Sequence, residues 1–287
     1  YRGHAIIAQR VQQYAIDCDL KYGAIDVALR PRHLAHQQQT HAALCARGME
    51  DQVRLVKADE LQHLLGTDKY LGGLVNTRNG HLHPLNLCLG EARAAAALGV
   101  SLFEGSGVTA IEHGTQAVVK TAQGSVRADF VVLAGNAYQQ LEPAVLSGLI
   151  FPAGSYIVAT EPLSAAEAAQ INPLDLAVCD MNEVLDYFRL SADRRLLFGG
   201  RCHCSGREPR DIGGTMVPRL RRIYPQLAHK RVEYAWGGKI AIVLNRVPLL
   251  GRIGPNVFYA LGYSGHGVSL SHAVGEVLAD AVAGTCE

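Results

Sequence analysis

The sequence predicts a mixed α/β fold, and three observations lead to this prediction. Two short apolar runs, at residues 129–135 and 256–261, resemble buried strands of a layered α/β sheet, and the first of them ends in small residues. The second run leads through a glycine-rich turn into a helical pattern at 268–283. Strand patterns dominate residues 150–247. We therefore expect an α/β layer and a larger strand-rich unit, with a chain that crosses between them more than once.

The first third of the chain has mainly helical patterns. Apolar residues recur at helical spacing in three segments, each followed by a glycine, and one segment alternates like a strand. The expected helices span 4–21, 33–47 and 58–65, and the expected strand spans 24–30. Residues 76–83 lie in a stretch rich in Gly and Asn, so we interpret them as a loop. The loop leads into a helix at 84–98, with Pro84 in its first turn.

The remaining elements are mostly strands. β-type runs separated by glycine turns alternate with one amphipathic helix. The expected strands span 106–112, 116–121, 130–133, 151–160, 184–200, 231–243 and 256–261, and the expected helices span 213–224 and 268–283.

The composition describes an ordinary packed protein. The 287 residues are 48% hydrophobic and 18% charged, and 27 basic and 26 acidic residues give a formal net charge of +1. No block of like charge is present, which argues against nucleic acid and membrane surfaces as partners. No apolar run approaches the roughly 20 residues that span a bilayer. We expect a cytoplasmic protein.

The cysteines and histidines do not predict a metal site. Seven cysteines form an odd set without the close spacing of a disulfide framework, so reduced thiols are expected. The cluster Cys202-His203-Cys204 lacks a second pair of ligands and is interpreted as the end of a strand. His81 and His83 flank the predicted helix start at Pro84, where capping and loop packing are expected.

A glycine-rich turn precedes the last predicted helix. Its sequence is Gly262-Tyr263-Ser264-Gly265-His266-Gly267-Val268. A helix start exposes unpaired backbone N–H groups and the positive end of the helix dipole, which together favour an anion. The glycines would let this backbone approach a ligand closely. A second interpretation stays open, in which the glycines serve only the tight turn from strand to helix.

Tyr187 and Arg189 are the candidate substrate-binding residues. They lie two positions apart on a predicted strand, so both side chains point to one face. A Tyr hydroxyl and an Arg guanidinium on one face can bind a carboxylate together. An exposed polar strand face is the alternative. Trp236, the only Trp in the chain, is expected to pack in the core.

Four ordered segments carry a resemblance to a known family. They are GHLHPLN (80–86), DFVVLAG (129–135), DYFRLSAD followed by RLLFGG (186–200), and the run 236–268. In this order they resemble the D-amino-acid-oxidase-like (DAO) family of FAD-dependent oxidoreductases, over nearly the whole chain. The resemblance implies oxidation of a C–N bond of an amine or amino acid, such as γ-glutamylputrescine, to an imine. It also implies non-covalent FAD, because residues 236–251 contain no Cys.

The resemblance assigns roles to single residues. Val108 would touch the adenine through its backbone, although an ordinary core strand residue is an equal alternative. Residues 264–268 would approach the pyrimidine end of the flavin, where backbone N–H groups stabilise negative charge. His266 would shape this turn, and no catalytic residue is assigned. Arg246 would bind substrate. The predicted cofactor-binding residues are Val108, Ala134, Gly135, Gly262, Tyr263, Ser264, Gly265, His266, Gly267 and Val268.

The same resemblance divides the chain between two domains. Residues 1–80 and 150–247 would form the substrate domain, and residues 81–149 and 248–287 would form the remaining part of the FAD-binding domain.

One family feature is missing from this sequence. The family's first strand, Gly-x-Gly-x-x-Gly turn and helix hold the FAD pyrophosphate, and no such unit is found here. We therefore expect a chain that lacks roughly the first hundred residues of such a protein. Two alternatives stay open: an FAD-free remnant that binds a small molecule or a partner protein, and an oxidase of another amino acid or N-methylated amine. The surface left by the missing unit is expected to favour self-association.

Overall fold

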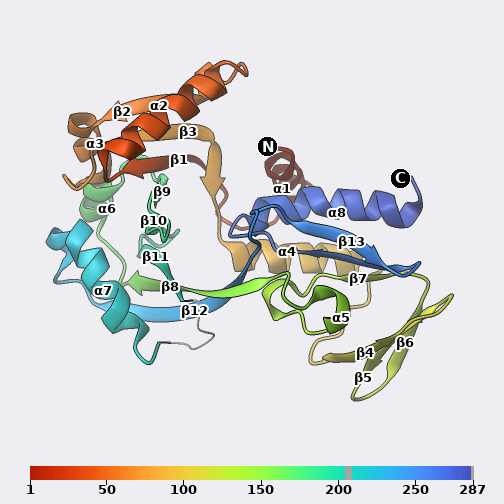
Figure 1. Cartoon of the computed structure of the whole chain (residues 1–287). Coiled ribbons are helices and arrows are strands. Elements are labelled where there is room, and N and C mark those ends of the chain that lie inside the picture. Colours follow the sequence, from red (N-terminus) through yellow and green to blue (C-terminus); the bar gives the residue numbers. More distant parts are fainter. Residues whose placement is uncertain (204–208, 286–287) are drawn as a thin grey trace.

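A computed structural model describes residues 1–203 and 209–285 and contains one large sheet and two small ones (Figure 1). Eight strands form the large sheet, and all neighbours are antiparallel except β1 and β9. Their order across the sheet is β12 (Val232–Ile242), β8 (Phe151–Thr160), β11 (Leu196–His203), β10 (Tyr187–Leu190), β9 (Ala177–Asp180), β1 (Lys21–Ala28), β3 (Gly72–His81) and β2 (Val53–Lys57). The parallel pair β1–β9 joins strands of the first 81 residues to strands of the middle of the chain.

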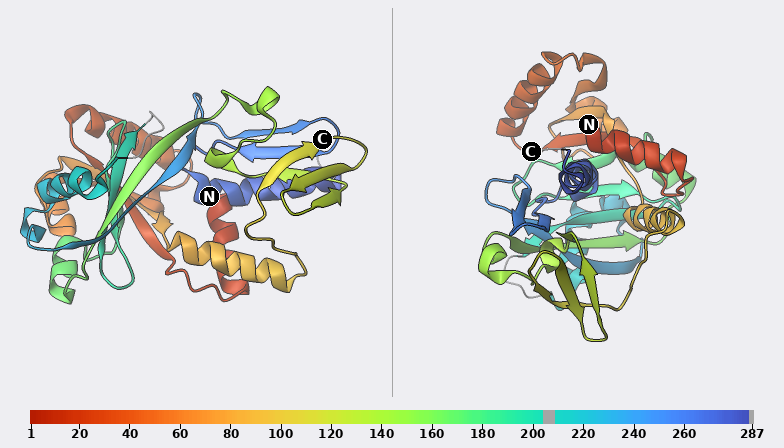
Figure 2. Two further views of the ribbon diagram at one scale, coloured as in Figure 1. Left: turned by 90° about the horizontal axis from the view of Figure 1, so that it is seen from below. Right: turned by 90° about the vertical axis from the view of Figure 1, so that its right-hand side faces the viewer.

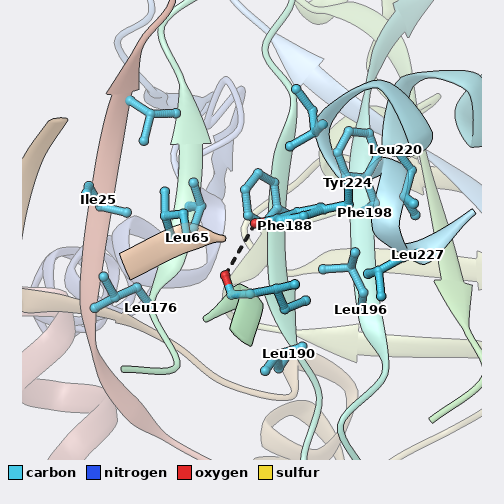
Figure 3. Packing of buried hydrophobic residues seen from close by; sticks show 14 of the residues in the cluster. Ile25, Leu65, Leu176, Phe188, Leu190, Leu196, Phe198, Leu220, Tyr224 and Leu227 are labelled. Atoms are coloured by element: carbon cyan, nitrogen blue, oxygen red, sulfur yellow. Dashed lines mark hydrogen bonds between the residues drawn. The ribbon is translucent and has the colours of Figure 1, made fainter. Parts of the chain in front are cut away.

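The main hydrophobic core covers one face of this sheet. Helices α3 (Ala58–Leu65), α6 (Ala165–Ile171) and α7 (Ile212–Ile223) pack there, together with the short helix η3 (Pro225–Leu227). Phe188 and Phe198 stack with ring centroids 5.9 Å apart, and Tyr224 meets Phe188 edge-on at 5.4 Å (Figure 3). These buried aromatic rings remove much apolar surface from water and fix the helices to this face.

The opposite face is covered only in part by α2 (Pro31–Cys45). Consecutive strand residues point to opposite faces, so Gly72 and Gly73 show which helix lies on which side. A Cβ on Gly73 would meet Ile25 and Leu61 of the main core, whereas one on Gly72 would meet Leu34 of α2. Over β10, β11, β8 and β12 the larger side chains of this second face are half-buried or exposed, whereas the small Ala159 is buried.

The two small sheets lie beyond one end of β8 and β12 (Figure 1). One consists of β13 (Leu249–Ile253), β14 (Val257–Leu261) and β7 (Val131–Leu133), in which β14 and β7 are parallel. The other is the antiparallel meander β4 (Val108–Glu112), β5 (Ala117–Thr121) and β6 (Ser125–Ala128). They share a small core around Leu133, Val257 and Leu261, which the short helix α5 (Pro143–Leu146) joins through Leu146.

Three long helices pack together beside the small sheets. They are α1 (Arg2–Gln13), α4 (Pro84–Ala97) and α8 (Gly267–Ala283), and Figure 2 shows α8 end-on with α1 beside it. Arg2 pairs with Glu276 of α8 at 2.8 Å. Glu91 of α4 accepts hydrogen bonds from Arg10 of α1 and from His272 of α8, both at 2.9 Å. No helix in the described residues is long and apolar enough to cross a membrane.

The mixed α/β fold class is confirmed, and three element predictions are wrong. The helix expected at 4–21 ends at Gln13, because Ala15 adopts a left-handed conformation (φ 48°). Residues 76–81 of the loop expected at 76–83 belong to strand β3, and beyond Asn76 this strand pairs with β1 alone. The single strand expected at 184–200 is two strands, joined by a turn in which Arg194 is left-handed (φ 61°).

Candidate functional site

Three segments that are distant in sequence meet at the start of α8. Strands β7 and β14 are parallel neighbours, so their carboxyl ends, at Leu133 and Leu261, lie at one edge of the sheet. That edge is where α/β sheets bind ligands. The turn 262–267 leaves β14 there, and the short helix η2 (Asn136–Tyr138) follows β7. The end of β12 completes the group, because Ser264 N–H donates to Ala241 O at 2.8 Å.

The turn has a defined backbone conformation. Gly262, Ser264 and Gly265 are all left-handed, with φ of 78°, 52° and 94°. A Cβ on Gly262 would lie 2.6 Å from Val243, so only glycine fits there. Ser264 is an uncommon residue for this conformation, and hydrogen bonds of its hydroxyl stabilise it there. It accepts a hydrogen bond from Val243 N–H at 3.1 Å and donates to Gly262 O at 3.3 Å.

Helix α8 begins with unused hydrogen-bond donors. His266 is its N-cap residue, is exposed, and provides no side-chain capping bond. Among the described residues, no atom accepts a hydrogen bond from the N–H groups of Gly267, Val268 or Ser269. A Cβ on Gly265 would meet nothing within 4 Å, so space is open in front of the turn. The helix start therefore fits an electron-rich or anionic group of a cofactor.

The face of the large sheet opposite the main core is not covered by α2 over β10, β11, β8 and β12, and we call this part the uncovered face. A row of side chains lies on it. Register places Tyr187, Gly199, Ile157 and Trp236 side by side across β10, β11, β8 and β12. A Cβ on Gly199 would lie 2.2 Å from the Tyr187 ring, so this glycine leaves room for the ring above β11. The Tyr187 hydroxyl forms a hydrogen bond with Ser155 Oγ at 3.1 Å. Burial raises the pKa of Tyr187, which keeps the phenol neutral at physiological pH.

Arg189 shares this face of β10 with Tyr187, as predicted. The two are half-buried, whereas the alternate residues Phe188 and Leu190 are buried in the main core. The guanidinium donates to Leu190 O at 2.9 Å and to Leu82 O at 3.0 Å. Burial lowers the pKa of Arg189. The arginine thus holds the segment before α4 against the sheet, and carboxylate binding by Tyr187 and Arg189 stays a prediction.

The other predicted site residues lie in different places. Ala134 and Gly135 are exposed between β7 and η2, next to the glycine turn. Arg246 is exposed and left-handed (φ 62°) in the turn after β12. Val108 begins β4 in the separate meander and is 39% exposed, so its alternative interpretation as a core residue is wrong. Their contacts with cofactor or substrate stay predictions. Tyr263, in the turn before α8, is half-buried, and Val268, in the first turn of α8, is exposed.

The structure tests the predictions made for His83 and Trp236. His83 is the N-cap of α4 and accepts a hydrogen bond from Asn86 N–H at 3.2 Å, so the capping prediction is confirmed. Among the described residues, no group of three or more His, Cys, Asp or Glu side chains could hold a metal ion. Trp236 is 43% exposed on the uncovered sheet face, so the expected core packing is wrong. Cys204 and the side chains of Cys202 and His203 lie outside the described residues.

Sequence reasoning missed several polar residues at this junction. Asn136 Oδ1 accepts a hydrogen bond from Gly262 N–H at 3.0 Å, and the Tyr138 hydroxyl accepts one from Lys239 N–H at 3.2 Å. Ser155 was also missed as the partner of Tyr187. A polar residue shortly after a strand, as Asn136 is three positions after the end of β7, was the available signal.

Comparisons with known proteins agree on one family. The sequence pattern of the family described as "FAD dependent oxidoreductase" (DAO) matches residues 1–281. Gamma-glutamylputrescine oxidoreductase of Escherichia coli is 39% identical over 100% of this chain and 67% of that protein. The probable oxidoreductase OrdL of Haemophilus influenzae is 40% identical over 98% of this chain and 66% of that protein. The chain thus spans about two thirds of the length of these relatives.

Solved structures show the same fold. Glycine oxidase from Geobacillus kaustophilus superposes with a TM-score of 0.84 at 21% identity, covering 99% of this chain and 76% of that one. L-proline dehydrogenase from P. horikoshii gives a TM-score of 0.83 at 19% identity, covering 97% and 76%.

Proposed function

Because the chain belongs to the DAO family of FAD-dependent oxidoreductases, we propose that it oxidises a C–N bond of an amine or amino acid to an imine. One observation carries this proposal. Helix α8 begins with unused N–H donors, and the turn before it is hydrogen-bonded through Ser264 to β12. Strand β12 belongs to the large sheet, and the uncovered face of this sheet carries Tyr187. The proposed cofactor-binding turn and the proposed substrate-binding surface are therefore directly connected.

The residues proposed to hold the flavin are those of the turn and the helix start. Within this segment, Gly267 and Val268 offer unused backbone N–H groups at the positive end of a 17-residue helix. When bound, the flavin accepts a hydride, and these N–H groups would stabilise the negative charge that reduction produces. Ala134 and Gly135 would line the same edge. Non-covalent binding is proposed, because residues 236–251 contain no Cys.

The substrate is proposed to lie on the uncovered face of the large sheet. Tyr187, Arg189 and Arg246 would recognise a carboxylate, with the neutral Tyr187 phenol as a hydrogen-bond donor. The reacting nitrogen must be neutral, since its carbon loses a hydride and the nitrogen loses a proton to give the imine. Water then hydrolyses the imine. The name of the E. coli relative makes γ-glutamylputrescine the first substrate to test.

An anaerobic titration tests the proposal. The purified chain is saturated with FAD and mixed with γ-glutamylputrescine, and loss of the visible flavin absorbance is followed. Reduction of the flavin, together with weaker apparent substrate binding in Tyr187→Phe, supports the proposal. If only an N-methylated or cyclic amino acid reduces the flavin, the proposed substrate is wrong and the proposed reaction class still holds. A chain that binds no FAD would leave the FAD-free binding protein as the function.

A further inference from the structure

Asn136 has a backbone conformation that few side chains tolerate. It is the first residue of η2, directly after Gly135, and its φ is +47°. Outside glycine, left-handed residues are uncommon, and Asn and Asp are the side chains that adopt this conformation most readily. An Asn therefore fits this backbone, and the contacts of its side chain show what it does.

The Asn136 side chain supports the glycine turn directly. Its Oδ1 atom accepts the hydrogen bond of Gly262 N–H at 3.0 Å, across 126 positions of sequence. Gly262 is buried, so without this acceptor its N–H group would be a buried donor with no partner. The bond lies just beyond the last pair of the β7–β14 ladder, Leu133 with Tyr259. It therefore extends the ladder into the loops that leave the two strands.

The same short helix is also bonded to the large sheet. Two residues after Asn136, the Tyr138 hydroxyl accepts a hydrogen bond from Lys239 N–H of β12 at 3.2 Å. Strand β12 in turn provides Ala241 O for the N–H group of Ser264. The helix η2, the turn and β12 therefore form a closed set of contacts, in which η2 is bonded to both of the other members.

We infer that Asn136 is a positioning residue, which holds the Gly262–Val268 turn in place relative to the sheet face that carries Tyr187. Its relevance to FAD rests on the proposed function, because only then does the turn face a flavin. Asn136 is proposed to act through the turn. A neutral acceptor suits this position better than a carboxylate, since an anion here would oppose the negative charge of a reduced flavin.

Amide hydrogen exchange tests this inference without any cofactor. The informative variant is Asn136→Gly, which tolerates the left-handed backbone but removes the acceptor. Its loss of one buried hydrogen bond is expected to speed exchange at Gly262 about tenfold in the free chain. Asn136→Asp keeps the acceptor and is expected to keep the wild-type exchange rate at Gly262.

A matched control separates positioning from general loss of stability. Asn172 is buried, and its Oδ1 accepts a hydrogen bond from Leu176 N–H at 2.9 Å, in the large sheet's own core. Asn172→Gly should therefore lower stability yet leave exchange at Gly262 unchanged. Wild-type exchange at Gly262 in Asn136→Gly would overturn the inference, whatever the chain does with FAD.

FAD titration then tests the connection to the site. If the wild-type chain binds FAD, Asn136→Gly is expected to bind it about tenfold more weakly, the effect of one lost hydrogen bond. Asn136→Asp should bind FAD but shift the flavin reduction potential downward. Unchanged affinity in Asn136→Gly would overturn the link between the turn and the flavin. Absence of FAD binding by the wild type, with the expected exchange result, would reject the proposed function and leave the positioning role supported.

Discussion

His81 illustrates how burial determines the protonation of a single residue. Its side chain is 5% exposed, and its Nε2 atom lies 2.7 Å from Asp175 O, to which it donates. Burial lowers the pKa of His81 below its ordinary value of 6.5, and nearby Arg189 acts in the same direction. The hydrogen bond to Asp175 opposes both effects without cancelling them. The folded state therefore favours the neutral imidazole.

We predict that His81 makes the protein less stable in mild acid. In the unfolded chain His81 binds a proton as the pH falls through about 6.5, whereas in the folded chain it stays neutral at this pH. The free energy of unfolding therefore falls as the pH drops through this value. His81→Gln keeps an N–H donor but does not titrate. The unfolding free energy of His81→Gln, measured by denaturant titration, should therefore fall less between pH 7.5 and 5.5 than that of the wild type. The exposed His63→Gln serves as control, and equal slopes in all three proteins would contradict the prediction.

A second prediction concerns the buried ion pair of Asp186 and Arg219. The Asp186 side chain is 3% exposed, and both Arg219 Nε and Nη2 contact its Oδ1, at 2.9 and 2.8 Å. Arg219→Met leaves a buried carboxyl group without its partner, which should cost about 3 kcal/mol of unfolding free energy. Adding Asp186→Asn should recover part of this loss. Urea unfolding of the three proteins measures both effects, and a loss below about 1 kcal/mol in the single variant would refute the role of the pair.

For single residues, sequence reasoning succeeded where one local rule determines the outcome. His83 before Pro84 caps a helix, and Tyr187 and Arg189 share a strand face because side chains alternate along a strand. Asn136 was missed because its partner, Gly262, is 126 residues away and no local pattern connects them. The exposure of Trp236 was missed for a similar reason, since β12 is an edge strand only in the assembled sheet.

Among whole elements, periodicity predicted the long helices and strands well. The expected helices at 33–47, 58–65 and 84–98 correspond to α2, α3 and α4, and the expected strands at 151–160 and 231–243 correspond to β8 and β12. Strand β3 was missed because its glycines favour a loop. Gly72 and Gly73 are required there because Leu34 and Ile25 pack directly against their backbone. Short strands such as β2 and β9 form through pairing, which a local pattern does not contain.

The crossing of α1 and α8 provides a prediction for the helices. A Cβ on Gly3 would lie 1.9 Å from Ser269 O, so the two backbones touch. Gly3→Ala should force the helices apart and destabilise the protein by about 2 kcal/mol. Because Ser269 belongs to the first turn of α8, FAD affinity should also fall. Gly275→Ala, in the open middle of α8, is the control and should stabilise by about 0.5 kcal/mol. Equal thermal midpoints for Gly3→Ala and the wild type would exclude this close packing.

Across the whole molecule, the mixed α/β class was predictable because it depends on the succession of patterns along the chain. The single large sheet joins strands from residues 21–81 to strands from 151–242 through the β1–β9 pair. The order of its eight strands was not predictable, because side-chain periodicity shows which residues share a face and does not show which strands pair. The proposed division into two domains stays a prediction.

The connection between α4 and β4 exposes four large apolar side chains within six residues. Leu98, Val100, Leu102 and Phe103 are all more than half exposed, with Phe103 at 74%. Contiguous exposed apolar residues of this kind mark surfaces that associate with other surfaces. The composition adds no strong repulsion, since the formal net charge is only +1. We therefore propose that this run, residues 98–103, promotes self-association of the chain.

Charge introduced into this run should reduce association. Leu98→Glu combined with Phe103→Glu replaces two exposed apolar side chains that make no part of the main core, so stability should change by less than about 0.5 kcal/mol. Sedimentation velocity over a range of concentrations is expected to show reversible oligomers for the wild type and mainly monomers for the double variant. Leu244→Glu, at a fully exposed position between β12 and β13, adds a charge elsewhere and should associate like the wild type. Equal association of the double variant and the wild type would contradict the role of residues 98–103, whereas a monomeric Leu244→Glu would place the contact at Leu244 instead.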